Sequence, residues 1–378
     1  MSPTLVILLV GSLVAASCAL VGSFLVLRRM ALLGDAISHA VLPGIAIAFL
    51  LAGERSALPM LLGAGALGLL TVFLVELFQR TRRLKEDASI GVVFPALFSL
   101  GVILISRYAS AVDLDLDCVL YGEIAYTPWD LIFLAGDSWG PKALWVNGGT
   151  LLANLLLVGL LYKELKVSTF DAGLAAAMGF SPALLHYLLM SAVSITVVGA
   201  FESVGAILVV AMLIVPPAAA YLLTDRLGVL LPLAVALGVV SSVGGYFLAH
   251  AWDASIAGAM AAVAGALFAL AFVASPRHGL AARLLAHRRL AGRLASRLLL
   301  FHLAEGGHPV PLATLERRFG WRRERLRRET ARLTAAGWAE VTPAGVELTA
   351  AGAEEVEWSG GQVLSHPLAG EEGLAAGT

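Results

Sequence analysis

Two side chains with metal-binding chemistry lie four residues apart in one of the most apolar segments of the chain. Asp35 and His39 both occur in LRRMALLGDAISHAVLPGIAIAFLL, residues 27–51. In a helix, an i, i+4 pair lies on one face with Cβ atoms about 5–6 Å apart. A carboxylate with a neutral imidazole suits Mn²⁺, Fe²⁺ or Zn²⁺ better than Ca²⁺ or K⁺. Because a charge at the bilayer centre is costly, we expect the pair to face a polar path.

A structural role is the alternative for this pair. Asp35 follows the basic pair Arg28 and Arg29, where its carboxylate could cap the N-terminus of a helix while His39 only packs. The residues alone support the two interpretations equally.

Composition predicts that most of the chain lies in a membrane. The 378 residues are 59% hydrophobic and 14% charged, whereas a soluble domain is about 45–50% apolar and about 25% charged. We predict an all-α polytopic membrane protein, with Gly34, Pro43 and Gly44 making its second span the most prone to a break. The nine predicted spans are 5–27, 33–52, 57–79, 89–106, 148–163, 183–200, 203–223, 228–249 and 254–274.

The positions of lysine and arginine predict the orientation of these spans. Basic residues follow every odd-numbered span, at Arg28 and Arg29, at 80–87, at Lys163 and Lys166, at Arg226 and at Arg277. Loops rich in lysine and arginine stay in the cytoplasm. The N-terminus is therefore predicted to lie outside and the C-terminus in the cytoplasm.

The chain lacks the sequence motif of a P-loop ATPase, which ends in Gly-Lys-Ser/Thr. Its four lysines, Lys85, Lys142, Lys163 and Lys166, do not follow a glycine. We therefore do not expect an enzyme, and transport would depend on a partner or on an ion gradient.

A short amphipathic segment between the fifth and sixth spans bears on this choice. In residues 166–187, Asp171 can begin a helix, Gly179 can end it and Pro182 can start the next one. Such a helix is either a docking site for a motor subunit or an ordinary connection.

Five motifs make the chain resemble the permease subunits of ABC importers for manganese, zinc or iron(II). They occur in the order of that family and cover most of residues 5–275. The last of them, with prolines 216 and 217, is most similar to the manganese/iron branch. The motifs are RRMALLGDAISHAVLPGIA (28–46), EDASIGVVFPALFSLGVILIS (86–106), LYGEIAYTPWDL (120–131), FDAGLAAAMGF (170–180) and VGAILVVAMLIVPPAAAYLLTDR (204–226).

The resemblance implies a set of partners and roles. The chain would lie in the bacterial inner membrane, pair with a second copy or a related permease, and work with a cytoplasmic ABC ATPase and an extracytoplasmic metal-binding protein. Asp35 and His39 match residues associated with the transported metal, Mn(II), Zn(II) or Fe(II), none of which would be bound permanently. The segment matching the coupling helix, which receives the ATPase, contains Phe170, Asp171, Ala175 and Gly179.

Two features are left open at this stage. Glu202, at the start of the seventh span, either guides cations or anchors a helix end. Residues 134–149, LAGDSWGPKALWVNGG, are interpreted as an insertion on the outer face, where a binding protein would dock.

A basic C-terminal extension follows the last span. Residues 277–340 contain fourteen arginines and five glutamates, a net charge of +9. The expected order of three helices and a hairpin resembles a winged helix-turn-helix, so we divide the chain into a permease domain (1–276), a cytoplasmic winged-helix-like domain (277–358) and a disordered tail (359–378). The residues that would read DNA in the third helix are Arg322, Arg323, Arg325, Arg327 and Arg328.

Contact of these arginines with anionic lipid headgroups or with the ATPase is favoured over DNA binding, because the domain is tethered to a membrane. The leading hypothesis for the whole chain is the permease of an ATP-driven importer, with Mn(II) as the favoured metal. The alternatives are a proton-coupled metal transporter, in which Asp35 and His39 relay protons, and a membrane-tethered metal-responsive regulator.

Overall fold

Apolar helices build the first of two units in the computed structural model. The structure describes residues 2–52, 57–80, 84–108, 124–134, 137–275, 279, 294–306 and 308–365. The units comprise residues 1–280 and 281–378. The long helices of the first unit are α1 (Pro3–Leu27), α2 (Ala31–Ala52), α3 (Ala57–Arg80), α4 (Glu86–Tyr108), α6 (Lys142–Leu160), α9 (Pro182–Val204), α10 (Ala206–Leu223), α11 (Leu227–Trp252) and α12 (Ile256–Ala274).

Eight helices in the described part of the chain are long and apolar enough to cross a membrane. They correspond to the first and to the third to ninth predicted spans. The second predicted span is α2, a helix of 22 residues that is not among these eight. The described chain thus confirms an all-α, multi-pass membrane protein.

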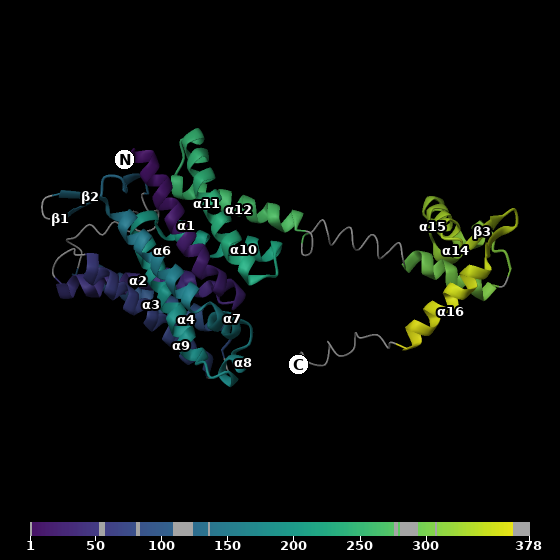
Figure 1. Ribbon diagram of the computed structural model, residues 1–378, viewed down its shortest axis with the longest axis horizontal. Coiled ribbons are helices and arrows are strands. Elements are labelled where there is room, and N and C mark those ends of the chain that lie inside the picture. Colours follow the sequence, from purple (N-terminus) through teal and green to yellow (C-terminus); the bar gives the residue numbers. More distant parts are fainter. Residues whose placement is uncertain are drawn as a thin grey trace. The chain divides into compact units, whose positions relative to one another are not determined.

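Helix α1 forms the centre of the first unit (Figure 1) and packs against α6, α9, α10 and α11. Its interior residues, such as Val14 and Phe24, are fully buried. At Gly22, an added Cβ would lie only 1.9 Å from the carbonyl oxygen of Leu213 in α10. Small residues allow membrane helices to approach this closely.

A polar contact also joins α1 to its neighbours in the core. The Nδ2 atom of Asn154 in α6 donates hydrogen bonds to Ser17 Oγ of α1 at 2.8 Å and to Thr196 Oγ1 of α9 at 2.7 Å. Interhelical bonds of this kind stabilise membrane helix packing, where an unpaired amide would be costly.

Helix α2, the span expected to be most prone to a break, is continuous from Ala31 to Ala52. Pro43 and Gly44 instead permit close packing. A Cβ at Gly44 would lie 2.4 Å from the carbonyl oxygen of Gly63 in α3, and a Cβ at Gly101 of α4 would lie 2.8 Å from Pro43. These contacts hold α2 between α3 and α4.

The two ends of the first unit carry different short elements (Figure 1). One end, which we call the α8 end, contains α7 (Tyr162–Phe170) and α8 (Ala172–Ala177). The other, which we call the hairpin end, contains the 3₁₀ turn η1 (Ile124–Tyr126) and the antiparallel strands β1 (Leu131–Leu134) and β2 (Asp137–Pro141).

Residues 134–149 contribute to regular elements at the hairpin end. They end β1, form β2 and supply the first two turns of α6. Helix α6 therefore begins at Lys142, six residues before the predicted start at residue 148. The polar residues Lys142 and Asn147 concealed this start from a hydrophobicity criterion.

The turn between α1 and α2 is only three residues long and has the hydrogen bonds of a Schellman motif. The amide of Met30 donates to Leu25 O at 2.9 Å, and the amide of Arg29 donates to Val26 O at 3.1 Å. Arg29 adopts φ +62°, the left-handed conformation for which glycine is favoured at this position.

Arg29→Gly should stabilise the protein by about 1 kcal/mol, because it removes the steric cost of a side chain in the left-handed region. Unfolding of the detergent-solubilised protein measures the change. Arg29→Ala is the matched control, since it removes the same charge but keeps the Cβ. Equal stabilities of the Gly and Ala variants would contradict the steric cost that we assign to a side chain at position 29.

The second unit is a small helical and hairpin region. Residues 294–306 are helical and are followed by α14 (Leu312–Phe319), α15 (Arg323–Ala335), the hairpin β3 (Ala339–Thr342) and β4 (Gly345–Leu348), and α16 (Ala350–Ser365). Val310 pairs with Val346 as an isolated bridge. The core of this region contains Leu299, Leu303, Leu315, Leu326, Leu333 and Val346.

The described residues confirm a small helical and hairpin region in this part of the chain, and its winged helix-turn-helix character stays a prediction. Helix α16 continues to Ser365, so the helical region extends seven residues beyond the predicted boundary at 358. The basic residues Arg277, Arg283, Arg288, Arg289 and Arg293, and the end of the predicted tail, lie outside the described residues.

Candidate metal site and partner surfaces

Asp35 and His39 lie together on one face of α2. His39 Nε2 is 3.5 Å from Asp35 Oδ1, and the side chains are 28% and 45% exposed for His39 and Asp35, respectively. The imidazole also contacts α4, with ring centroids 5.3 Å from Phe94 and 6.2 Å from Phe98. Helix α2 thus supplies both polar groups, and the aromatic rings of α4 orient the imidazole.

The position of Asp35 in α2 excludes the capping alternative. The helix begins at Ala31, so Asp35 is its fifth residue, beyond the first turn in which a cap residue reaches free amides. At 1.5 Å per residue, Asp35 lies about 6 Å and His39 about 12 Å from the first helical residue. The carboxylate is therefore available for chemistry other than capping.

The pair supplies two ligand side chains. No group of three or more His, Cys, Asp or Glu residues with metal-binding geometry occurs within the described parts of the chain. Mn²⁺ and Fe²⁺ prefer more ligands than two. Water or a second polypeptide would have to complete the coordination of an ion at this pair.

Glu202 lies at the hairpin end, in the C-terminal part of α9, so its predicted place at the start of the seventh span is wrong, because α10 begins only at Ala206. Its carboxylate forms an ion pair with Lys142, the first residue of α6. Both residues line a cavity of about 200 Å³ that also contains Asp130. The ion pair neutralises Glu202 locally and ties α9 to α6, which favours the helix-anchoring interpretation of this residue.

Helix α8 has the three boundary features predicted from its sequence. Asp171 Oδ1 accepts a hydrogen bond from the amide of Leu174 at 2.9 Å, so it caps the helix. Gly179 has φ +89° just after the helix, and Pro182 begins α9. Asp171 is also the C-cap of α7, so the two short helices meet at one residue.

The predicted coupling residues differ in exposure. Ala175 is fully buried and holds α8 against the bundle, whereas Phe170 is exposed. Leu174 and Met178, which the sequence analysis did not select, are exposed as well. Leu174 and Met178 are four residues apart, and this spacing was the available signal, because residues i and i+4 lie near one face of a helix.

Asp171→Ala should destabilise α8 by about 1 kcal/mol, because the amide of Leu174 loses its acceptor. Hydrogen exchange of the α8 amides in the detergent-solubilised protein measures this as roughly fivefold faster exchange. Asp171→Asn is the matched control and should keep the cap, since asparagine is an equally good cap residue. Unchanged exchange in Asp171→Ala would contradict the capping role.

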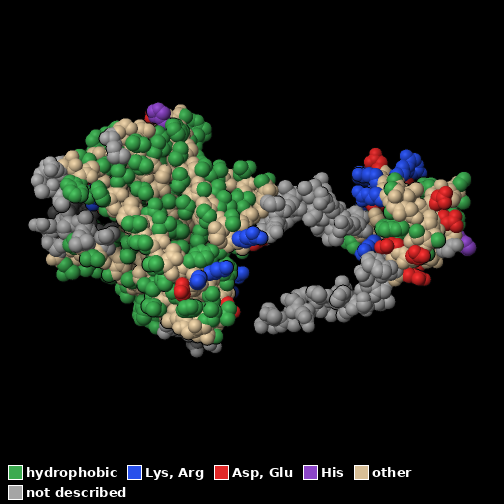
Figure 2. All heavy atoms as spheres, viewed as in Figure 1, with side chains coloured by type: hydrophobic (Ala, Val, Ile, Leu, Met, Phe, Trp, Pro, Cys, Tyr) green, Lys and Arg blue, Asp and Glu red, His purple; other side chains and the backbone are tan. Residues whose placement is uncertain are grey.

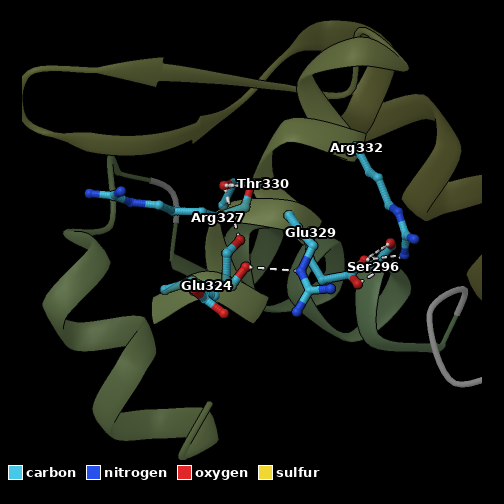
Figure 3. Close-up of polar contacts among 8 residues, drawn as sticks. Ser296, Glu324, Arg327, Glu329, Thr330 and Arg332 are labelled. Carbon is cyan, nitrogen blue, oxygen red and sulfur yellow. Dashed lines mark hydrogen bonds and ion pairs between the residues drawn. The ribbon is translucent and has the colours of Figure 1, made fainter. Parts of the chain in front are cut away.

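In the second unit, several arginines of α15 already have partners. Arg323 pairs with Glu316 at 2.9 Å, and the Arg325 guanidinium lies 4.9 Å from the centroid of the Trp321 ring. Figure 3 shows a third contact, in which Arg332 Nη1 and Ser296 Oγ donate to the buried carboxylate of Glu329 at 2.9 and 2.7 Å.

Three further arginines are exposed without a carboxylate partner within the described residues: Arg322, the N-cap of α15, and Arg327 and Arg328 within it. Arg328 Nε donates only to the backbone carbonyl of Glu324. We call these three arginines the α15 basic face. Charged side chains of both signs occur on the visible side of this unit, whereas apolar side chains dominate the visible side of the first unit (Figure 2).

The hairpin of the second unit carries the opposite charge. Glu340 and Glu347 are exposed and lie directly opposite each other in β3 and β4. The hairpin contains no lysine or arginine. Contacts with DNA phosphates depend on positive side chains, so this hairpin would repel a duplex rather than hold it.

The first unit is similar to known membrane transport proteins. Residues 3–275 match the ABC 3 transport family. The chain is 50% identical over 273 residues to the manganese transport system membrane protein MntD of Bacillus subtilis, covering 72% of this chain and 92% of that protein. It is 46% identical over 307 residues to the zinc transport system membrane protein TroD of Treponema pallidum, covering 81% of this chain and 83% of that protein.

A solved structure supports the same assignment. PsaBC from Streptococcus pneumoniae, in complex with Fab, matches with a TM-score of 0.61 and 33% sequence identity, covering 74% of this chain and 94% of that chain. The chain therefore belongs to the ABC 3 transport family. It is a membrane permease component, and the family assignment gives it no ATP-hydrolysing role of its own.

Proposed function

We propose that the chain is the membrane-spanning subunit of an ATP-driven importer of divalent transition metal ions, with Mn(II) as the favoured substrate and Zn(II) and Fe(II) as alternatives. The observation that carries the proposal is the Asp35–His39 pair on one face of α2. Manganese and zinc transport proteins among its relatives support the substrate class.

A second permease chain, either a copy or a related subunit, completes the metal path. Asp35 is 45% exposed on the single chain, and a carboxylate facing lipid hydrocarbon is costly. A partner that covers this face of α2 removes that cost. With two-fold symmetry it also brings two carboxylates and two imidazoles around one axis, enough to replace much of the hydration shell of the ion.

An ABC ATPase drives this path through α8. The exposed apolar side chains Phe170, Leu174 and Met178 provide the contact surface, and the buried Ala175 transmits force from it to the bundle. The α8 end accordingly lies in the cytoplasm, as the arginines and lysines at this end favour.

An extracytoplasmic metal-binding protein delivers the ion at the hairpin end. We assign to Glu202 the anchoring of α9 to α6 through Lys142, which keeps this docking face rigid. Proton coupling remains the rival mechanism for the Asp35–His39 pair, and it requires no ATPase.

Asp35→Ala and His39→Ala should each lower metal uptake while the transport complex still assembles. Even the outer partners of metal ligands contribute about 10–100-fold to affinity, so loss of a ligand should lower uptake by at least about tenfold. Uptake of Mn²⁺ into proteoliposomes containing the ATPase and the binding protein measures the effect.

His250→Ala is the matched control for this experiment. His250 is exposed at the far end of α11 and stacks on Tyr246, so its loss should leave uptake unchanged. Normal uptake by the Asp35→Ala/His39→Ala double variant would refute the role of the pair.

For the second unit, we propose that the α15 basic face contacts anionic lipid headgroups. The unit is tethered to a membrane protein, and the acidic hairpin opposes the phosphates of a DNA duplex. Each arginine near an anionic bilayer surface contributes about 1 kcal/mol.

Charge reversal of Arg322, Arg327 and Arg328 to Glu should abolish this contact. Hydrogen exchange of α15 is measured in the full chain embedded in nanodiscs, with phosphatidylcholine alone or with added phosphatidylglycerol. We expect protection of α15 by phosphatidylglycerol at low salt, lost in the triple variant and kept in the control Arg297→Glu. Protection by a DNA duplex instead of by phosphatidylglycerol would favour the regulator alternative.

A further inference from the structure

Arg28 connects elements that are far apart in the sequence at the α8 end. It is the C-cap residue of α1 and is half-buried. Its Nε donates to Thr169 Oγ1 at 3.2 Å and its Nη2 donates to Ser168 Oγ at 3.0 Å. Its Nη1 lies 3.4 Å from Nδ1 of His186. One guanidinium therefore joins α1 to the last turn of α7 and to the first turns of α9.

The α7 side of this contact lies next to the helix that we assign to ATPase docking. Ser168 and Thr169 are followed by Phe170 and then by Asp171, the residue at which α7 ends and α8 begins. Because only two residues separate the bonded hydroxyls from the first residue of α8, a displacement of α8 moves the partners of Arg28.

The α1 side of the contact lies next to the metal pair. The turn from Arg28 to Met30 is held by the Schellman hydrogen bonds, and α2 begins at Ala31. Asp35 follows one helical turn later. A three-residue turn with a fixed hydrogen-bond pattern has little freedom to absorb motion, so a shift of Arg28 is passed to the start of α2.

A second series of contacts connects Arg28 to α3, which packs against α2. His186 contacts Arg28, and the next residue, Tyr187, donates a hydrogen bond to Glu76 of α3. Helix α3 packs directly against α2. The contacts from Arg28 therefore lead to α2 along the chain and also through α9 and α3.

We propose that Arg28 is a positioning residue that couples movement of α7 and α8 to the Asp35–His39 pair. The inference rests on the proposed function and adds the route by which the ATPase changes the metal site. The planar guanidinium is suited to this role because its five donors reach three groups on two helices at once. A lysine at the same position carries the charge but lacks this fork.

The test compares metal transport with ATP hydrolysis in proteoliposomes containing the complete transporter. Arg28→Ala should lower the number of Mn²⁺ ions imported per ATP hydrolysed by roughly tenfold, within the range of about 5–150-fold that is typical of coupling between sites. Arg28→Lys should lower the same ratio. Binding of the ATPase should remain unchanged, because Phe170, Leu174 and Met178 are retained.

A second variant removes the same contact from the other side. Ser168→Ala/Thr169→Val deletes both α7 hydroxyls that bond Arg28 and leaves Arg28 in place. It should therefore lower the number of Mn²⁺ ions imported per ATP hydrolysed, as Arg28→Ala does. Arg226→Ala is the matched control, because Arg226 is an exposed arginine at the same end of the bundle. It should leave the ratio unchanged.

Two results would overturn the inference. One is a wild-type ratio of Mn²⁺ to ATP in Arg28→Ala. The other is a parallel fall of uptake and hydrolysis in both the Arg28 and the α7 variants, which is the behaviour of a purely structural contact. Failure of the proposed function gives a different result, since the wild-type transporter would then import no Mn²⁺ with ATP.

Discussion

The constraint on which the structure depends is the presence of a carboxylate and an imidazole in an apolar membrane helix. The cost of exposing Asp35 to hydrocarbon requires a polar environment on that face of α2, and the single chain leaves the face partly open. Close contacts at Gly44 and Gly101 fix α2 between α3 and α4, while Phe94 and Phe98 orient His39. The apolar packing therefore serves to hold two polar groups at a defined position.

The same bundle links this position to its two ends. At the hairpin end, the Lys142–Glu202 ion pair fastens α6 to α9. At the α8 end, Arg28 joins α1, α7 and α9 through one guanidinium. Buried polar contacts such as that of Asn154 with Ser17 and Thr196 connect the helices between the ends. Specific polar contacts thus join the helices at both ends and in the middle of the bundle, and small residues occur where the helices pack closely.

Much of this architecture was predictable from the sequence, since membrane spans are defined by length and apolarity. The errors have local physical causes. Lys142 and Asn147 concealed the start of α6. Pro43 made α2 the span most prone to a break, although a proline can be accommodated in a packed membrane helix. The placement of Asp35 and His39 on one helix face was also predictable from their spacing, while their role toward a metal stays a prediction. The contacts of Arg28 were not predictable, because its partners lie 140 to 158 residues away and no periodic pattern reports such separations.

Uptake of Mn²⁺, Zn²⁺ and Fe²⁺ into liposomes tests the central claim most directly, with the chain reconstituted either alone under a pH gradient or together with its ATPase and binding protein. The account predicts that metal enters only when the ATPase, the binding protein and ATP are all present, and that Mn²⁺ is taken up best. Metal uptake by the chain alone, driven by the pH gradient, would contradict it and would make the Asp35–His39 pair a proton relay.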